Sequence, residues 1–512
     1  MSNWTHSSAL LVCALVAIAS GDSKKNVSSS SYNVTTAAGL EALRNLARNV
    51  TLANWKPWEA RLHRNVSASE QLIYGEPILS AMTNLVVMNL TEEAKKGRQW
   101  IYDRMNFSLI TERVRTVKVV NEYMGSLLSL YALTKDALFL NKSKEIADFL
   151  NANFYHKGFL AQEIEPLRQV KVLSTLEISS MGGGTVEYGY LNSLNRRVPD
   201  RAKEMLLVAL DYSREKSKGL FPVSVNGYSW IDLTEFLTLQ SGQSIFFTSL
   251  LHRYNMKAAG DSETERIRYF KTFLEVMDSA RKNRLLDVSK AGNVFVRDKN
   301  FKLKSGKQSF HEPMMMLEGC VHGGNLLLAG KVLKELEAAN AYSGVHNFTW
   351  ANCSSDYTEL GERLIETCHL ASNKTVTKLP PNHIFFSDDE EADNKRFAFQ
   401  GYKFDSGIAQ SYFLGWRLTR KQKYREYAAE LLQAIEKHTA VSPKEGGGYA
   451  PIVNVQKVPT QRPGFKQRFI DHFHATLKYL FLTFSEDENP VLPLDKWVFN
   501  VLGHPIPVNS KS

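Results

Sequence analysis

TLKYLFLTFSEDENPVLPLDKWVFNVLGHPIP, residues 476–507, carries the strongest indication of the fold in this chain. Its first part, from Leu477 to Phe484, is apolar almost all the way round at helical spacing. A helix without a polar face is buried inside a larger assembly. The turn-forming residues 485–490 end that helix, and the short, apolar segment after them, punctuated by proline, predicts a hairpin. We therefore expect a buried helix and a hairpin within a large helical domain.

Other segments repeat the helical pattern. Apolar residues recur at helical spacing within residues 424–435 and 139–150, and residues 325–336 give a third helix. Strand alternation is scarce, and residues 293–296 and 449–455 are the best candidates for short strands. With 512 residues and 43% hydrophobic content, the chain can bury a large core. These patterns predict an all-α domain of about a dozen helices with short hairpins at its ends.

The N-terminal residues are predicted to form a secretory signal. Residues 9–19 (ALLVCALVAIA) are an apolar run too short to span a membrane comfortably, and residues 17–19 offer a small-x-small cleavage site. We predict a signal peptide over residues 1–20, with a short signal anchor as the alternative because no Lys or Arg precedes the run. The rest of the chain has no second apolar run of about 18 residues, so no other membrane span is expected. The chain is thus predicted to enter the secretory pathway, in the endoplasmic reticulum or Golgi lumen or outside the cell.

A Ser/Thr-rich segment follows the signal. Residues 21–54 are predicted to be a glycosylated linker before a domain of residues 55–508, with order beginning near Gly39 or Trp55. The density of N-x-[ST] sequons supports the secretory prediction and indicates a glycosylated surface. These sequons begin at Asn26, Asn33, Asn49, Asn65, Asn89, Asn106, Asn141, Asn347, Asn352 and Asn373.

The charge distribution argues against one class of function, and the cysteine content predicts a disulfide bridge. The formal net charge is +10, but the basic residues are spread along the chain and form no block interleaved with aromatics, so nucleic-acid binding is not expected. Cys13 would leave with the signal peptide. Cys320, Cys353 and Cys368 remain. In an oxidising lumen these three predict one bridge and one free thiol.

Several motifs, in order, resemble those of glycoside hydrolase family 47, the class I α-1,2-mannosidases. The chain has ELGERLIETC at 359–368 where the family has ELAEELxETC, GGYAPIVNVQ at 447–456 for GGYSSINNVQ, and FNVLGHPIP at 499–507 for FNTEAHPLP. The resemblance covers nearly everything from residue 55 on. It implies an (α/α)7 barrel with a small C-terminal β-hairpin plug. It also implies a Cys320–Cys368 bridge, which leaves Cys353 free.

Members of the family hydrolyse the mannoside bond with inversion of configuration at the anomeric carbon of mannose. They use two carboxyl groups, one as general acid and one as general base, together with a calcium ion. The same motifs put other side chains at those positions. Ser80 and Thr83 stand where the family has two Asp residues, and Gln243 and Phe247 stand at the acid positions of its carboxylate helix. Met316 stands in place of the catalytic Asp, and Gly407 and Gln410 stand in place of two Glu residues. Ala475 stands in place of the sugar-site Glu, and Val501 stands in place of the calcium-binding Thr. Phe, Met, Gly and Ala cannot transfer protons, and Val501 lacks a side-chain oxygen for a hard cation. We therefore expect that this chain has lost the family mechanism and does not bind the calcium ion, and we expect no other cofactor. If the family activity is retained, calcium is expected as the cofactor.

A few acids could substitute for the lost ones. Glu177 matches the family's general acid only if Gly182–Gly184 is an insertion; otherwise Ser180 stands there. Asp405 could replace the base if two residues are inserted, and Glu312 and Glu318 lie near the lost Asp out of register.

Other side chains are candidates to line the barrel. Glu187 keeps a family Glu and either faces the cavity, where it would bind a ligand, or pairs with a cation. His311, His472 and His474 are candidates for polar barrel-lining groups, with satisfied core or surface histidines as the alternative, and residues 314–316 (MMM) are expected to be helix core.

Three functions remain open. The first is a catalytically inactive or weak family member that binds a high-mannose N-glycan or a glycoprotein. The second is an active calcium-dependent inverting mannosyl-oligosaccharide 1,2-α-mannosidase that trims high-mannose N-glycans with relocated acids. The third is a secreted interaction protein whose barrel is filled by Phe247 and Met316.

Overall fold

The computed structural model describes residues 32–59, 68–110, 113–156, 158–172, 174–216, 220–226, 236–240, 242–301, 308–310, 314–339, 353–386, 401–463 and 472–508. The predicted signal peptide, residues 1–20, lies outside these residues. Within them, no helix is both long and apolar enough to cross a membrane.

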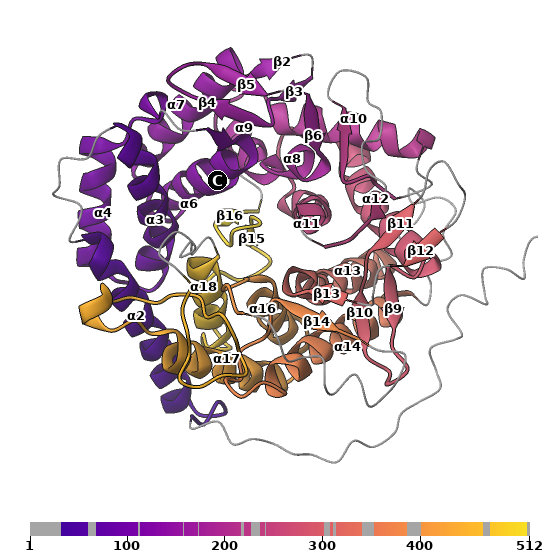
Figure 1. The fold of residues 1–512 in the computed structure, drawn as a ribbon. Coiled ribbons are helices and arrows are strands. Elements are labelled where there is room, and N and C mark those ends of the chain that lie inside the picture. Colours follow the sequence, from indigo (N-terminus) through magenta and orange to yellow (C-terminus); the bar gives the residue numbers. More distant parts are fainter. Residues whose placement is uncertain are drawn as a thin grey trace, which may run out of the picture.

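An inner ring of helices forms the wall of a barrel (Figure 1). Each helix packs on the next, and the last contacts the first, so the ring is closed. Within the described residues, seven helices make this ring: α3 (Ala68–Val87), α6 (Gly125–Thr134), α9 (Thr185–Leu194), α11 (Gly242–Met256), α13 (Val321–Ala338), α16 (Gly407–Thr419) and α18 (Phe473–Thr483). Every residue of α18 is buried, as its all-round apolar pattern predicts.

An outer ring covers the inner one (Figure 1). Its seven described helices are α2 (Ala37–Glu59), α4 (Thr91–Arg104), α7 (Ala137–Asn153), α10 (Arg201–Lys216), α12 (Glu263–Lys282), α14 (Cys353–Asn373) and α17 (Lys423–Thr439). These helices are amphipathic: α17 buries Tyr424, Ala428, Leu431 and Ile435 against the inner ring. Two concentric rings of seven helices confirm the predicted (α/α)7 barrel.

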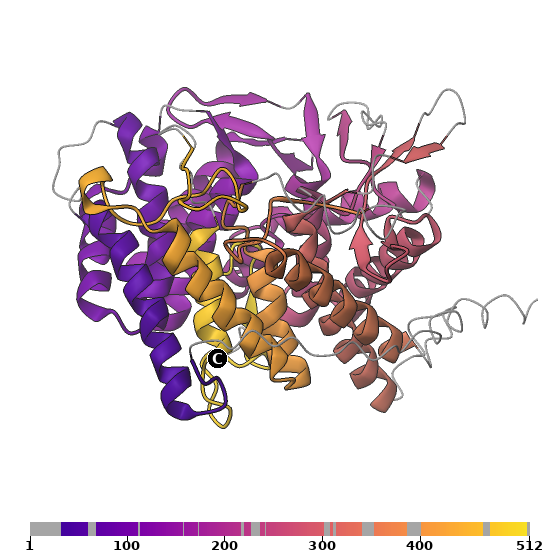
Figure 2. The same cartoon turned by 60° about the horizontal axis from the view of Figure 1, so that its bottom comes forward.

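The inner helices all run in the same direction. Each described inner-to-outer connection is short: α6 ends at Thr134 and α7 begins at Ala137, while α16 ends at Thr419 and α17 begins at Lys423. The returns from an outer helix to the next inner helix are longer and carry the strands. Figure 2 shows these strands gathered at one end of the barrel. The N-termini of the inner helices therefore line that strand-bearing end.

The strands are short and antiparallel. Two sheets have three strands, in the orders β1-β4-β5 and β12-β11-β8, and the other pairs are β2-β3, β6-β7, β9-β10, β13-β14 and β15-β16. Their bounds are β1 (Val114–Arg115), β2 (Tyr155–His156), β3 (Phe159–Leu160), β4 (Glu163–Glu165), β5 (Val170–Val172), β6 (Thr175–Glu177), β7 (Ser224–Asn226), β8 (Phe236–Leu237), β9 (Leu286–Val288), β10 (Val294–Val296), β11 (Lys299–Phe301), β12 (Gln308–Phe310), β13 (Met314–Met316), β14 (His383–Phe385), β15 (Trp497–Phe499) and β16 (Pro505–Pro507).

Short helical segments lead into the inner helices or link other elements. They are η2 (Phe107–Leu109), α5 (Thr116–Lys118), the π-helix η3 (Val119–Met124), α8 (Ile178–Gly182), η4 (Leu317–Cys320) and η6 (Pro443–Glu445). Of these, α8 directly follows β6, and η4 directly joins β13 to α13.

The C-terminal hairpin plugs the barrel, as predicted. Strands β15 and β16 pair with Val498 opposite Ile506, and they contact α6, α9 and α11 at the centre of the ring (Figure 1). Gly503 in the turn has φ 72°, and a Cβ there would lie 3.1 Å from the Cβ of Ala475. The turn therefore requires glycine both for its left-handed backbone and for its close approach to α18.

The predicted bridge joins the two rings. Cys320, at the end of η4, is bonded to Cys368 on α14. The inner helix α13 begins at the next residue, Val321, so the bridge ties the start of α13 to the outer helix α14.

Three expectations are corrected. The linker predicted over residues 21–54 is too long, because α2 begins at Ala37 and buries Leu43, Ala47 and Val50 in the core. Residues 314–316, expected to be helix, form β13 because they pair with β14. Residues 449–455 make only isolated bridges, Ala440 with Tyr449 and Tyr402 with Ile452, whereas the strand expected within 293–296 is present as β10.

The sequons fall mostly on the surface where the structure describes them. Asn33, Asn49, Asn89, Asn106 and Asn141 are exposed. Asn373 is half-buried, and its Oδ1 accepts a hydrogen bond from Lys378 Nζ at 2.8 Å. The remaining sequons, at Asn26, Asn65, Asn347 and Asn352, lie outside the described residues.

Candidate functional site

The strand-bearing end of the barrel collects charged side chains at the starts of inner helical segments. Glu177 is the N-cap residue of α8, Glu318 lies in η4 just before α13, and Asp405 lies two residues before α16. His472 is the N-cap residue of α18. Helix N-termini favour negative charge. We call Glu318, Asp405 and His472, with Lys403 and His383, the mouth cluster.

Asp405 is held in place by the start of α16. The backbone N–H of Gly407 donates to Asp405 Oδ1 at 2.8 Å. A Cβ at residue 407 would lie 3.0 Å from that oxygen and 3.1 Å from the backbone nitrogen of Val321, so glycine lets α16 approach α13. The family's Glu cannot occupy position 407 unless Asp405 or α13 shifts.

One further contact and one unusual backbone angle lie on this side of the cluster. Ser406 Oγ and His472 Nδ1 are 3.3 Å apart, which links the start of α16 to the start of α18. Phe404, just before Asp405, has φ 62°, a left-handed conformation that is unusual for an aromatic residue. The backbone that presents Asp405 is therefore set by three inner helices packed together.

Burial and neighbouring charges shift the pKa values of the two carboxyls. Burial, and after it the charge of Asp405, raises the pKa of Glu318 to about 7, while His472, Lys403 and His383 oppose the shift. Burial raises the pKa of Asp405 to about 6, against the effect of the Gly407 N–H. Although the Glu318 side chain is exposed to solvent, protein surrounds it closely enough to cause this shift. Glu318 is therefore exposed to solvent and also close to other charged groups.

Glu177 is ion-paired and hydrogen-bonded to neighbouring residues. Its carboxylate pairs with Arg115 and accepts a hydrogen bond from Ser179 Oγ at 3.1 Å. Its backbone N–H donates to Gln162 Oε1 at 3.1 Å. The predicted general-acid candidate is thus an ion-paired residue at the edge of the mouth. Glu312, the other weighed substitute, lies outside the described residues.

Apolar side chains fill the positions of the family's interior acids. Phe247 is 1% exposed, and its ring centre is 5.6 Å from that of Phe246, 6.2 Å from that of Phe221 and 6.3 Å from that of His322. Ala475 is buried against the hairpin turn. Met316 is half-buried on β13, where its backbone N–H donates to Gln240 Oε1. These groups have no proton to exchange with a substrate.

Glu187 is part of the plug contact and does not face an open cavity. It is 1% exposed, and Asn500 Nδ2 donates to its carboxylate at 2.6 Å and to the carbonyl of Asn121 at 2.7 Å. Burial raises the pKa of Glu187 to about 7, which the Asn500 hydrogen bond opposes. The expected ligand contact or direct cation pair is replaced by a hydrogen bond from β15–β16.

The residues at the hairpin turn do not fit calcium. Val501 offers only a backbone carbonyl, and the Asn500 side-chain oxygen already accepts from the N–H groups of Leu502 at 3.0 Å and His504 at 2.8 Å. Within the described residues, no group of three or more His, Cys, Asp or Glu side chains could hold a metal ion. Calcium prefers six to eight oxygen ligands, several of them carboxylates.

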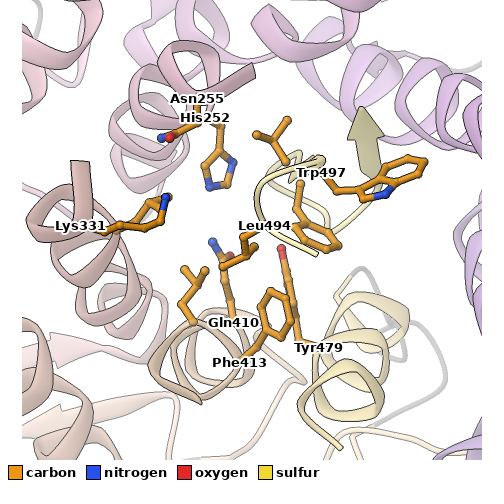
Figure 3. A pocket seen from close by; sticks show the side chains of 12 residues that line it. His252, Asn255, Lys331, Gln410, Phe413, Tyr479, Leu494 and Trp497 are labelled. Atoms are coloured by element: carbon orange, nitrogen blue, oxygen red, sulfur yellow. The ribbon is translucent and has the colours of Figure 1, made fainter. Parts of the chain in front are cut away.

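A small cavity of about 30 Å³ lies beside the hairpin. Figure 3 shows side chains from α11, α13, α16, α18 and the hairpin converging on it, among them His252, Gln410 and Tyr479. His252 Nδ1 and Tyr479 Oη have no described hydrogen-bond partner. A space of this size holds about one water molecule. This cavity beside the hairpin is therefore too small for a sugar.

The sequence marks Glu318, Asp405 and His472 as three separate candidates and gives no sign that they lie at the same end of the barrel. Lys403, His383 and Ser406 were missed, and no motif marks them. The available signal is positional: each of these residues lies just before an inner helix or on the strand pair that precedes one.

Comparisons with known proteins agree with this architecture. A family model described as Glycosyl hydrolase family 47 matches residues 56–508. The chain is 29% identical over 464 residues to Mannosyl-oligosaccharide alpha-1,2-mannosidase IA of Spodoptera frugiperda, which covers 89% of this chain and 64% of that relative. It is 25% identical over 446 residues to Endoplasmic reticulum mannosyl-oligosaccharide 1,2-alpha-mannosidase of Schizosaccharomyces pombe, which covers 85% of this chain and 81% of that relative. The match thus spans less than two thirds of the insect relative.

A solved structure shares the fold. The alpha-1,2-mannosidase from Trichoderma reesei has a TM-score of 0.73 and 17% sequence identity, and the match covers 94% of this chain and 100% of that one. At this identity the likeness concerns the architecture alone.

Proposed function

Because the chain belongs to glycosyl hydrolase family 47, we propose that it binds a high-mannose N-glycan, free or on a glycoprotein, without hydrolysing it by the family's calcium-dependent reaction. Binding takes place at the strand-bearing end of the barrel. The protein works in the lumen of the secretory pathway or outside the cell, in keeping with its sequons and with the printed name of the S. pombe relative.

The observation that carries the proposal is the set of side chains at the acid positions. Phe247 and Ala475 are buried and apolar, Gly407 has no side chain, and Val501 gives calcium no side-chain ligand. An inverting glycosidase needs a protonated acid on one side of the bond and a base that activates water on the other. Neither role can be filled from these positions.

Glycan binding is favoured over loss of all function by the polarity of the mouth. Solvent reaches Glu318 and Lys403, and the relatives are named for acting on mannosyl-oligosaccharides. Sugar sites combine a few well-placed polar groups with an otherwise preformed surface. The mouth cluster supplies such groups on the ends of rigid helices.

The test is equilibrium binding to the full secreted chain. A high-mannose N-glycan with a fluorescent label at its reducing end is titrated with protein by anisotropy, and the glycan is recovered and weighed by mass spectrometry. We expect saturable binding, competition by unlabelled glycan and an unchanged glycan mass. A complex-type N-glycan without terminal mannose serves as the control. No binding at the highest protein concentration in the titration contradicts the proposal.

The buried aromatic cluster favours a second candidate, an interaction protein with a filled barrel. The ring of Phe247 packs among Phe221, Phe246 and His322 and closes this part of the interior. For such a protein the labelled glycan is expected not to bind at all. The same titration therefore separates the two candidates.

A further inference from the structure

We propose that the cavity beside the hairpin binds the hydroxyl group of a small neutral molecule, water or methanol, between His252 and Tyr479. The hairpin contributes Leu494 and strand β15 to this cavity, whereas its turn at Gly503 lies against Ala475 in the first turn of α18. His252 lies near the C-terminal end of α11, away from the strand-bearing end of the barrel. The site is therefore separate from the proposed glycan-binding end, and the inference goes beyond the proposed function.

His252 presents a hydrogen-bond acceptor to the cavity. Its side chain is 4% exposed, and Figure 3 shows its ring pointing into the cavity. Burial lowers the pKa of His252 to about 4, which a hydrogen bond with the backbone of Phe499 opposes, so the ring is neutral at pH 7. A hydrogen bond that favours the charged ring is one in which the ring donates. Because Nδ1 has no partner among the described residues, Nε2 carries the proton and Nδ1 presents a lone pair.

Tyr479 presents a hydroxyl group from the opposite wall of the cavity (Figure 3). Its side chain is 1% exposed, and burial raises the pKa of Tyr479, so the hydroxyl keeps its proton. The ring packs against Phe413 and Phe499, with ring centres 5.5 Å apart in both pairs, which fixes the position of the hydroxyl. In the described part of the chain, Tyr479 Oη has no hydrogen-bond partner either. One hydroxyl group that donates to His252 and accepts from Tyr479 satisfies both buried groups.

The size and charge of the cavity select the class of ligand. Its volume of about 30 Å³ admits a water molecule or little more. An apolar molecule would leave both buried polar groups without a partner, which is costly. An ion would lose its hydration, because the charged lining residue Lys331 already pairs with Glu335 at 2.7 Å. A hydroxyl group meets neither cost, and the 3% exposed Gln410 lies beside it as a third partner. A methyl group next to the hydroxyl would face the apolar wall, which is made of Leu328, Phe413, Leu414, Val498 and Phe499.

The first experiment is a crystal structure of the wild-type secreted chain, so it does not depend on how variants fold. One crystal is kept in aqueous buffer and a second is soaked in methanol. We expect an oxygen atom within hydrogen-bonding distance of both His252 Nδ1 and Tyr479 Oη. Two-atom density after the soak identifies the site as open to an alcohol, and unchanged one-atom density identifies water as its ligand. Density at neither crystal's cavity, or density that touches only one of the two groups, overturns the proposal.

The second experiment measures the site in solution by urea unfolding at pH 7. Tyr479→Phe removes the hydroxyl that the ligand contacts, and we expect it to raise the equilibrium constant for unfolding about fivefold, the effect of one neutral hydrogen bond. Tyr424→Phe on α17 is the matched control. Tyr424 is also fully buried and its Oη has no described partner, but it does not line the cavity. Tyr424→Phe is therefore expected not to raise the unfolding constant, and an equal response of the two variants overturns the proposal.

Discussion

Replacing Arg253 with methionine is expected to lower the free energy of unfolding by about 3–5 kcal/mol. Arg253 lies on the inner helix α11, and its side chain is fully buried. Its Nε and Nη2 donate to the two oxygens of Asp261, both at 2.6 Å, and Nη2 also donates to Asp200 at 2.7 Å. Removing the guanidinium leaves buried carboxylates without their main partner, and that costs more than the pair contributes.

A surface pair on neighbouring helices provides the control. Arg268 of α12 and Asp211 of α10 are 2.5 Å apart, but the Asp211 side chain is 70% exposed. Arg268→Met is expected to change stability by less than about 1 kcal/mol, as exposed pairs do. Both variants are measured by urea unfolding at pH 7. Equal losses in Arg253→Met and Arg268→Met contradict the assignment of a buried ion cluster to α11.

Replacing Lys478 with methionine is expected to change the pH dependence of stability. Lys478 of α18 is fully buried, and its Nζ donates to Thr83 Oγ1 at 2.7 Å and to the carbonyl of Gly503 at 2.8 Å. Burial lowers the pKa of Lys478 from 10.5 to about 7, which Glu122 opposes. Thr83 stands where the family has an Asp, so the ammonium has a hydroxyl at that position in place of a carboxylate.

The direction in which stability changes with pH follows from the lowered pKa of Lys478. Between pH 7 and about 10 the unfolded chain keeps the Lys478 proton and the folded chain loses it, so stability rises with pH. Below pH 7 both states are protonated, and the cost of burying the charge is fully present. The stability of wild type relative to Lys478→Met is therefore expected to increase by up to about 1.4 kcal/mol per pH unit in this window.

The measurement is urea unfolding of both proteins at pH 7, 8 and 9. Taking the difference between two proteins at each pH removes the contribution of other titrating groups. Lys496→Met, at an exposed position in the same C-terminal segment, is the control and should show no trend. A difference that stays constant for Lys478→Met over the three pH values contradicts a buried lysine that loses its proton near pH 7.

The barrel could be predicted because its helices carry strong patterns. The all-round apolar α18 and the one-sided α17 were both evident from spacing alone. The error at α2 has a physical reason: Leu43, Ala47 and Val50 have helical spacing, but they lie beside a Ser/Thr-rich run that dominates the local composition. The strand β13 was missed because three consecutive methionines fit a buried helix or a buried strand equally well.

The replacement of the family's acid and calcium-binding residues could be predicted from the motifs, whereas the mouth cluster could not. Phe247, Ala475 and Val501 stand inside stretches whose neighbours keep the family pattern, so each substitution is visible in the chain. Glu318 and Asp405 are far apart in sequence, and they lie at the same end of the barrel because α16 packs against η4 and α13. Nothing in the sequence around either residue specifies that placement.

We conclude that this barrel keeps the family fold, and we propose that it lacks the family reaction. The most direct test is incubation of a high-mannose N-glycan with a large amount of the purified chain, with calcium and with EDTA, followed by mass spectrometry of the glycan. An active α-1,2-mannosidase run in parallel shows that the assay detects hydrolysis. We expect no mannose release in either buffer. Release of α-1,2-linked mannose that EDTA abolishes would contradict the proposal.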